Sequence, residues 1–112
     1  MGRKKYRKER IKKLIPKLKK FKESNKIQKL ILFGSYGRGD FTKHSDVDII
    51  LIDKKFRDKN VFERTKGLWL KWHLNLKINY PVDFICYTPE EFNKLKKEVS
   101  IASEALKEGI EV

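Results

Sequence analysis

Leu30-Ile31-Leu32-Phe33-Gly34-Ser35 is the stretch around which the chain is organised. An apolar run that ends in Gly-Ser predicts a buried strand that turns sharply into a short helix, because glycine frees the backbone at the turn. Backbone N–H groups at such a junction lack partners and carry partial positive charge, which suits a phosphate. The stretch therefore predicts a phosphate-binding turn at the end of a core strand.

A second apolar segment carries two aspartates. Asp46 and Asp48 lie two residues apart, which places both carboxylates on one face of a strand, with their backbones roughly 6–7 Å apart. Uncompensated negative charge is expensive here, since the neighbours are apolar: Val47, Ile49, Ile50, Leu51 and Ile52. Oxygen ligands without a Cys or His cluster favour Mg²⁺ or Mn²⁺ over zinc.

A third aspartate, Asp83, interrupts the apolar segment 82–86. A neighbouring strand would bring it beside Asp46 and Asp48, and three such carboxylates can hold two divalent ions about 3.5–4 Å apart. In the alternative interpretation, Asp83 merely faces water after Pro81. We favour the catalytic interpretation, because three strand acids and the turn together have no common structural explanation.

These residues resemble a known signature. Gly34-Ser35, Arg38-Gly39 and Ser45-Asp46-Val47-Asp48 are similar to the G-S-x-x-R-G…S-D-x-D motif of the DNA polymerase β-like nucleotidyltransferase superfamily. The likeness is greatest to its small members, the minimal nucleotidyltransferases. It covers about residues 27–112, and Asp83 also stands in a family-like place.

The resemblance implies transfer of a nucleoside monophosphate, in the first instance AMP from ATP, to a hydroxyl acceptor with release of pyrophosphate. It implies that Asp46, Asp48 and Asp83 form a site for two Mg²⁺ ions, with Mn²⁺ as the alternative. By the same resemblance, Asp83 activates the acceptor hydroxyl. The implied nucleotide-binding residues are Gly34, Ser35, Arg38 and Ser45; a salt bridge within the turn is the competing role for Arg38.

Three hypotheses for the partner follow. The first is an enzyme that nucleotidylates a partner protein. The second is an antitoxin-type binding module, because minimal nucleotidyltransferases resemble proteins that neutralise a HEPN-domain ribonuclease, some by adding AMP to a tyrosine. The third is an RNA-directed nucleotidyltransferase that binds RNA through its basic N-terminus.

Positive charge is concentrated in the N-terminal segment. Residues 1–29 hold 14 Lys and Arg against two acidic residues, hence a net charge of +12, whereas the rest of the chain has a net charge of +1. Apolar residues at helical spacing predict an amphipathic helix from Lys5 to Ser24, which Pro16 should kink or split. Its charged face would form a ridge that contacts solvent, RNA or an acidic partner.

The remaining segments complete a single α+β domain, 1–112, with a basic helical segment 1–26. We expect a small mixed sheet flanked by helices on one side, as in the polymerase β-like palm. Periodicity predicts one long helix over 60–77, in which Trp69 and Trp72 pack in the core, stack on bases or form a dimer surface. Further predicted elements are helices over 89–98 and 99–108 and a short strand over 110–112.

Composition bears on membrane association and on the cellular compartment. No apolar run approaches 18 residues, so the sequence predicts no membrane span, and the basic N-terminus lacks the apolar region of a secretory signal. A single cysteine, Cys86, excludes an internal disulfide and suits a reducing compartment, which predicts a cytoplasmic location.

Overall fold

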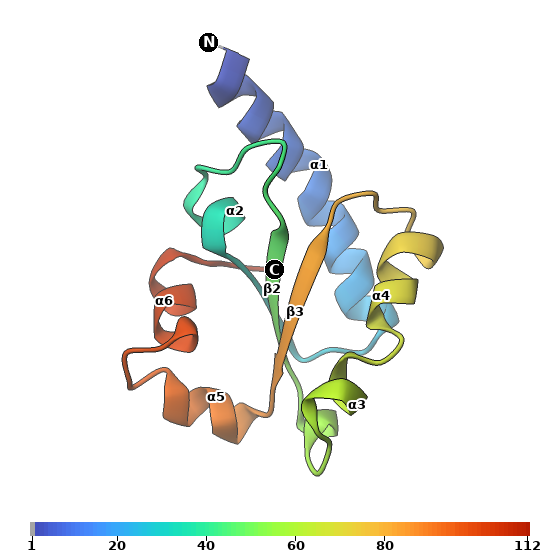
Figure 1. Cartoon of the computed structure of the whole chain (residues 1–112), viewed down its shortest axis with the longest axis vertical. Helices are drawn as coiled ribbons and strands as arrows, with labels where there is room; N and C mark the ends of the chain where they lie inside the picture. Colours follow the sequence, from blue (N-terminus) through green and yellow to red (C-terminus); the bar gives the residue numbers. More distant parts are fainter. Residues whose placement is uncertain (1) are drawn as a thin grey trace.

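The computed structural model describes residues 2–112, and its centre is a four-stranded mixed sheet with the strand order β3-β2-β1-β4 (Figure 1). β1 runs antiparallel to β2 and β4, whereas β3 runs parallel to β2. This arrangement confirms the predicted α+β class. The strands are β1 (Lys29–Phe33), β2 (Val47–Ile52), β3 (Val82–Tyr87) and β4 (Ile110–Glu111).

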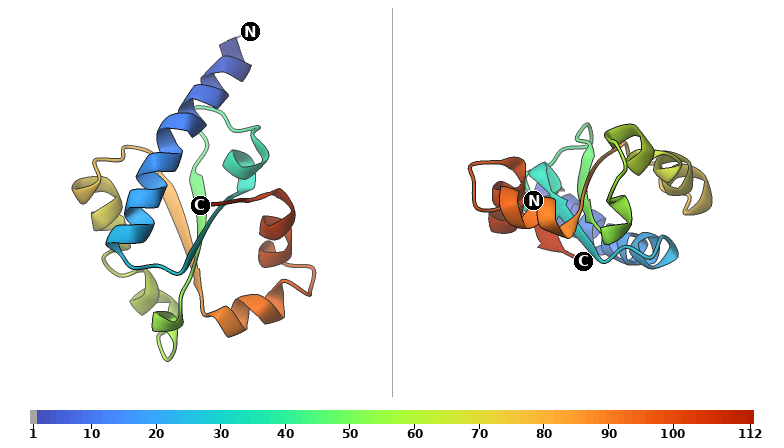
Figure 2. Two further views of the ribbon diagram at one scale, coloured as in Figure 1. Left: turned by 180° about the vertical axis from the view of Figure 1, so that it is seen from behind. Right: turned by 90° about the horizontal axis from the view of Figure 1, so that it is seen from below.

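Helices cover both faces of the sheet, so the prediction of helices on one side only is wrong. α1 (Gly2–Ser24) crosses one face, as the rear view in Figure 2 shows, and buries Leu14, Leu18 and Phe21 against it. α5 (Pro89–Leu95) and α6 (Ile101–Glu108) pack on the other face. The physical reason is that β1 and β2 are apolar at nearly every position, and such strands need cover on both sides.

α1 is one uninterrupted helix, so the predicted split at Pro16 does not occur. Pro16 lies on the exposed side of the helix, opposite the buried Leu14 and Leu18. A carbonyl that loses its intrahelical partner on that side can bind water instead, which makes proline tolerable there.

The predicted long helix over 60–77 is broken into short pieces. α3 (Val61–Thr65), α4 (Leu68–Leu70) and the π-helical turn η2 (Lys71–Asn75) replace it. The chain changes direction at Gly67, whose φ of 82° is left-handed. Trp72 is fully buried, as the core interpretation predicts, but Trp69 is 57% exposed.

The helices predicted over 89–98 and 99–108 are present as the shorter α5 and α6. The side chain of Thr88 caps α5 by accepting from Glu91 N, and Pro89 occupies the first turn. α6 ends at Gly109, and the predicted terminal strand is present as β4 on the outer edge of β1. Cys86 is a buried free thiol, and burial raises its pKa to about 12.

Two glycines allow the C-terminal segment to approach the sheet. A Cβ atom on Gly109 would lie 2.3 Å from Ala105 O and 2.7 Å from Ile31 Cγ2. A Cβ on Gly37, in α2 (Gly34–Arg38), would lie 3.3 Å from Gly109 Cα. Glycine is therefore required for close packing at Gly109, where φ is ordinary.

We expect Gly109→Ala to lower the free energy of unfolding by about 1–3 kcal/mol, because the added methyl group overpacks a backbone contact. Lys107→Ala, an exposed substitution in the same helix, is the matched control and should change stability little. Urea unfolding followed by circular dichroism measures both values. Equal stabilities for the two variants would contradict this account of the helix end.

The helices in the described part of the chain are all too short or too polar to cross a membrane.

Candidate active site

The predicted phosphate turn lies where β1 passes directly into α2. Gly34 is the first residue of α2 and has a φ of 66°, in the region that favours glycine. Such a short helix needs tertiary support, and Tyr36 supplies it by stacking on Phe41, with ring centroids 4.0 Å apart and planes at 4°. The first N–H groups of the turn, at Gly34 and Ser35, are thus held on a rigid base.

Arg38 links α2 to its surroundings by salt bridges. Its Nε lies 3.2 Å from Asp40 Oδ2, and its Nη1 lies 3.5 Å from Glu108 Oε2 in α6. This confirms the structural role considered for Arg38. The guanidinium also lies close enough to Asp48 to favour that residue's charged form.

Asp48 and Asp83 lie side by side on the sheet. They are register partners in the parallel pair of β2 and β3, while Phe33 faces Asp48 across the antiparallel pair with β1. Strand alternation puts both carboxylates on the face that α5 and α6 partly cover. In Figure 1 the upper ends of β2 and β3 lie side by side below the loop that joins α2 to β2.

The phosphate turn and the aspartates touch each other directly. A Cβ atom on Gly34 would lie 2.4 Å from Asp48 Oδ2 and 3.2 Å from its Cγ. The carboxylate of Asp48 therefore lies in the space that a side chain at position 34 would fill. Glycine is required here twice, by its positive φ and by this contact.

Asp48 experiences the field of both other aspartates. Burial raises the pKa of Asp48, the charges of Asp83 and Asp46 raise it further, and the charge of Arg38 lowers it. Asp46 and Asp83 are both exposed, whereas Asp48 is half-buried. Asp46 and Asp83 thus lie near enough for their charges to act on Asp48.

This pKa shift predicts a pH-dependent stability. A carboxyl group with a raised folded-state pKa destabilises the fold when it is ionised, and protonation relieves that penalty. The Tm of Asp48→Asn should therefore exceed that of the wild type at pH 7, and the difference should shrink as the pH falls from the raised pKa towards about 3.9. Calorimetry of both proteins from pH 7 to pH 4, without divalent ions, measures it; a constant difference would contradict the assignment.

The three carboxylates are the kind of ligand that a divalent cation prefers, but they are not placed closely enough to ligate one ion together. Residues 2–112 contain no group of three or more His, Cys, Asp or Glu side chains placed closely enough to ligate one ion. The donors are hard oxygens, and their mutual repulsion is what a cation would relieve.

Ser45 shapes the loop that leads into β2. Its Oγ accepts a hydrogen bond of 2.9 Å from Thr42 N, and its N–H donates to Thr42 O at 3.1 Å. Ser45 therefore holds this turn by hydrogen bonds to the main chain, and its role in binding nucleotide stays a prediction. Val47 N donates to Pro81 O at 2.8 Å, which joins this loop to the start of β3.

Two arginines of α1 reach the loops beside the site, which the sequence did not indicate. Arg7 Nε donates to Phe41 O at 2.8 Å, and the Arg10 guanidinium lies 3.8 Å from the ring centroid of Tyr80. Tyr80 O in turn accepts from Trp72 Nε1 at 2.9 Å. The residues in contact are far apart in the sequence. The charge pattern of the helix alone therefore cannot show whether these arginines make such contacts or face solvent.

Comparisons with known proteins bear on the family to which this chain is similar. The family described as "Nucleotidyltransferase domain" matches residues 11–112. Two proteins of Methanocaldococcus jannaschii, each named a protein adenylyltransferase, are similar to this chain. One is 38% identical over 90 residues, which are 80% of this chain and 82% of the relative. The other is 30% identical over 105 residues, 88% of this chain and 98% of the relative.

Structural comparison adds a likeness of fold. The crystal structure of a Sulfolobus solfataricus protein named a nucleotidyltransferase matches with a TM-score of 0.58. The match covers 88% of this chain and 85% of that one at 24% sequence identity, so it bears on the fold alone.

Proposed function

This chain belongs to the nucleotidyltransferase domain family, and we propose that it transfers AMP from ATP to a hydroxyl group of a partner protein. The observation that carries the proposal is the contact between the turn and the acids. Asp48 lies against Gly34 and beside Asp83, so a triphosphate on the turn would have its α-phosphate near these carboxylates.

The proposed reaction is an in-line displacement at the α-phosphorus. The acceptor oxygen forms a bond to phosphorus, and the bond from phosphorus to the α,β-bridging oxygen breaks. The acceptor proton passes to the carboxylate of Asp83, and pyrophosphate leaves with the bonding electron pair. Asp83 suits this role because it is exposed and lies one strand away from Asp48.

Asp46, Asp48 and Asp83 would hold Mg²⁺ or Mn²⁺, which would neutralise charge on the phosphates and on the departing pyrophosphate. The N–H groups at Gly34 and Ser35, with Arg38 nearby, would bind the triphosphate oxygens. Fixed donors and charges of this kind supply most of the rate acceleration in phosphoryl chemistry. Ser45 would contribute by holding the loop before Asp46.

The names of the relatives favour a protein acceptor over RNA. A HEPN-domain ribonuclease, which the sequence resemblance implies, is the first candidate for that acceptor. The antitoxin-type module would use the same surface with little or no transfer. Mass spectrometry of such a partner after co-expression distinguishes the two, since transfer adds AMP to the partner and simple neutralisation does not.

Nucleotide binding is tested by isothermal titration of ATP with Mg²⁺. The wild type should bind, and Asp46→Asn/Asp48→Asn should bind at least about tenfold more weakly, because the cation that bridges protein and phosphates loses two charged ligands. Undiminished binding by the double variant would contradict the proposed site.

A further inference from the structure

β3 forms one edge of the sheet, and part of its outer side is free. Strand residues direct their backbone groups alternately to one side and the other. Pro81 O accepts from Val47 N and Tyr87 O accepts from Asp53 N, so the odd-numbered residues of β3 face β2. Val82, Phe84 and Cys86 therefore direct their N–H and C=O groups away from the sheet.

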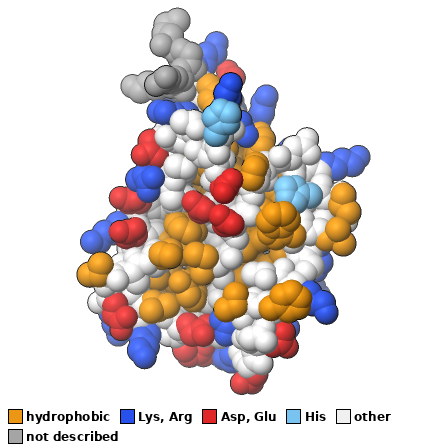
Figure 3. Space-filling view, viewed as in Figure 1, with side chains coloured by type: hydrophobic (Ala, Val, Ile, Leu, Met, Phe, Trp, Pro, Cys, Tyr) orange, Lys and Arg blue, Asp and Glu red, His pale blue; other side chains and the backbone are white. Residues whose placement is uncertain are grey.

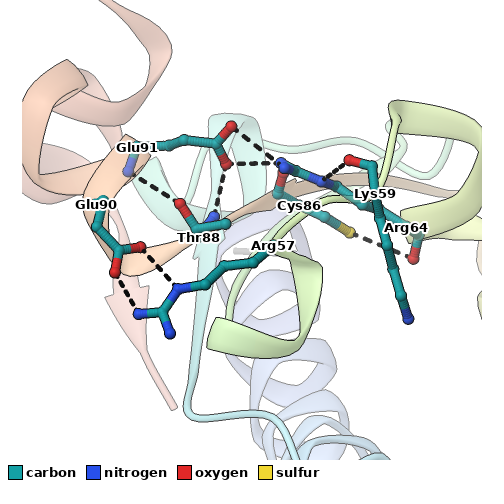
Figure 4. Close-up of polar contacts among 7 residues, drawn as sticks. All are labelled: Arg57, Lys59, Arg64, Cys86, Thr88, Glu90 and Glu91. Atoms are coloured by element: carbon teal, nitrogen blue, oxygen red, sulfur yellow. Dashed lines mark hydrogen bonds and ion pairs between the residues drawn. The ribbon is translucent and has the colours of Figure 1, made fainter.

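In the part of the chain that the structure describes, this outer side is capped at its far end. Arg64 Nη1 donates to Cys86 O at 3.0 Å, and Arg64 is itself held by Glu91 Oε1 at 2.6 Å and by Lys59 O at 2.8 Å (Figure 4). Among the described residues, no such bond reaches the outward groups of Val82 or Phe84. The exposed part of the edge is thus the half that carries Asp83.

A groove lies beside the second half of β3. Its volume is about 270 Å³, and it lies at the capped end of the edge, between Val61, Arg64 and Thr65 of α3, residues 84–87 of β3 and Glu91 of α5. Figure 3 shows hydrophobic side chains gathered beside and below a small group of acidic side chains. Unpaired backbone groups on a strand edge, such as those of Val82 and Phe84, are a template for pairing with another chain.

We infer that an extended segment of the acceptor protein adds antiparallel to the outer edge of β3 and presents its hydroxyl side chain opposite Asp83. This inference rests on the proposed function. Asp83 directs its own backbone towards β2, so the residue opposite it would belong to a non-hydrogen-bonded pair. Such pairs have the closest approach, about 4.5 Å between Cα atoms, and their side chains share one face.

This register specifies the acceptor sequence. The residues before and after the acceptor would exchange hydrogen bonds with Phe84 and Val82, respectively. The residue two positions before the acceptor would lie beside the half-buried Ile85, so an apolar side chain is expected there. The Arg64 cap on Cys86 would end the pairing, which limits recognition to a short segment.

The test uses a fluorescein-labelled peptide, Lys-Lys-Ile-Thr-Tyr-Thr-Val-Glu, with Mg²⁺ and α,β-methylene-ATP, which cannot transfer AMP. N-methylation of either threonine amide that flanks the tyrosine removes a hydrogen bond to the edge and should weaken binding at least tenfold. N-methylation of the tyrosine amide, which points away from β3, should change the affinity less than threefold. Fluorescence anisotropy gives each dissociation constant.

A substitution in β3 provides a second test of peptide binding. Ile85→Lys should weaken binding of the unmethylated peptide at least tenfold, whereas Val99→Lys, the same change at a fully exposed residue, should not alter it. Circular dichroism and titration with ATP establish that each variant is folded.

Alternating sensitivity of the peptide amides supports strand addition. Absence of peptide binding, equal sensitivity at all three amides, or self-association of the protein through this edge would overturn it. Transfer is then scored separately with ATP. Peptide binding with the alternating pattern but without AMP on the tyrosine would contradict the proposed function and leave the strand inference standing.

Discussion

Replacing Asp48 with Asn is expected to lower AMP transfer by about 10²–10³-fold and, at the same time, to raise the Tm of the metal-free protein. Activity falls because a neutral amide neither binds a divalent cation strongly nor fixes it beside the α-phosphate. Stability rises because the repulsion from Asp46 and Asp83 that raises the pKa of Asp48 disappears. Transfer assays and calorimetry on one preparation measure both effects.

Asp58→Asn is the matched control for this pair of effects. Asp58 is exposed and has a φ of 61°, a conformation that asparagine also tolerates. Neither activity nor Tm should change appreciably. A lower Tm for Asp48→Asn than for the wild type would contradict this account, in which Asp48 destabilises the fold but is needed for the reaction.

Gly34→Ala is expected to abolish nearly all activity and to destabilise the fold. An alanine at a φ of 66° costs about 1–2 kcal/mol, and its Cβ would overlap Asp48 Oδ2. Relief of that overlap must displace either the phosphate turn or the carboxylate. A displacement of about 1 Å at a reacting centre can lower the rate about 10²-fold.

Gly67→Ala separates the effect of backbone strain from the effect of the overlap with Asp48. Gly67 has a similar φ of 82°, but nothing lies within 4 Å of its added Cβ. Its alanine variant should lose about 1–2 kcal/mol of stability through backbone strain alone and keep its activity. If Gly34→Ala and Gly67→Ala lost equal stability and both remained active, the contact between turn and carboxylate would have no functional weight.

The turn at Gly34 and the strand position of Asp48 were predictable because their signals are local. Two aspartates separated by one residue, and an apolar run ended by Gly34-Ser35, specify a strand edge and a turn without knowledge of the rest of the fold. Capping at Thr88 is equally local. The parallel alignment of Asp48 with Asp83 was only an expectation, since no residue pattern in the sequence sets the register between β2 and β3.

Features that depend on distant contacts were not predictable. Helical periodicity over 60–77 does not reveal that Gly67 adopts a left-handed conformation and divides the segment, which leaves Phe62 72% exposed. A lysine- and arginine-rich helix face likewise does not reveal which of its side chains contact the rest of the protein. Arg7 and Arg10 make such contacts because α1 passes the loops beside the site.

The most direct test of nucleotidyl transfer uses ATP labelled with ³²P at either the α or the γ position. The protein is incubated with each, together with Mg²⁺ and an extract of the source cell, and Asp48→Asn serves as the control. The account predicts label on an acceptor protein from α-labelled ATP alone, and none with Asp48→Asn. Label from γ-labelled ATP, or equal labelling by Asp48→Asn, would contradict it.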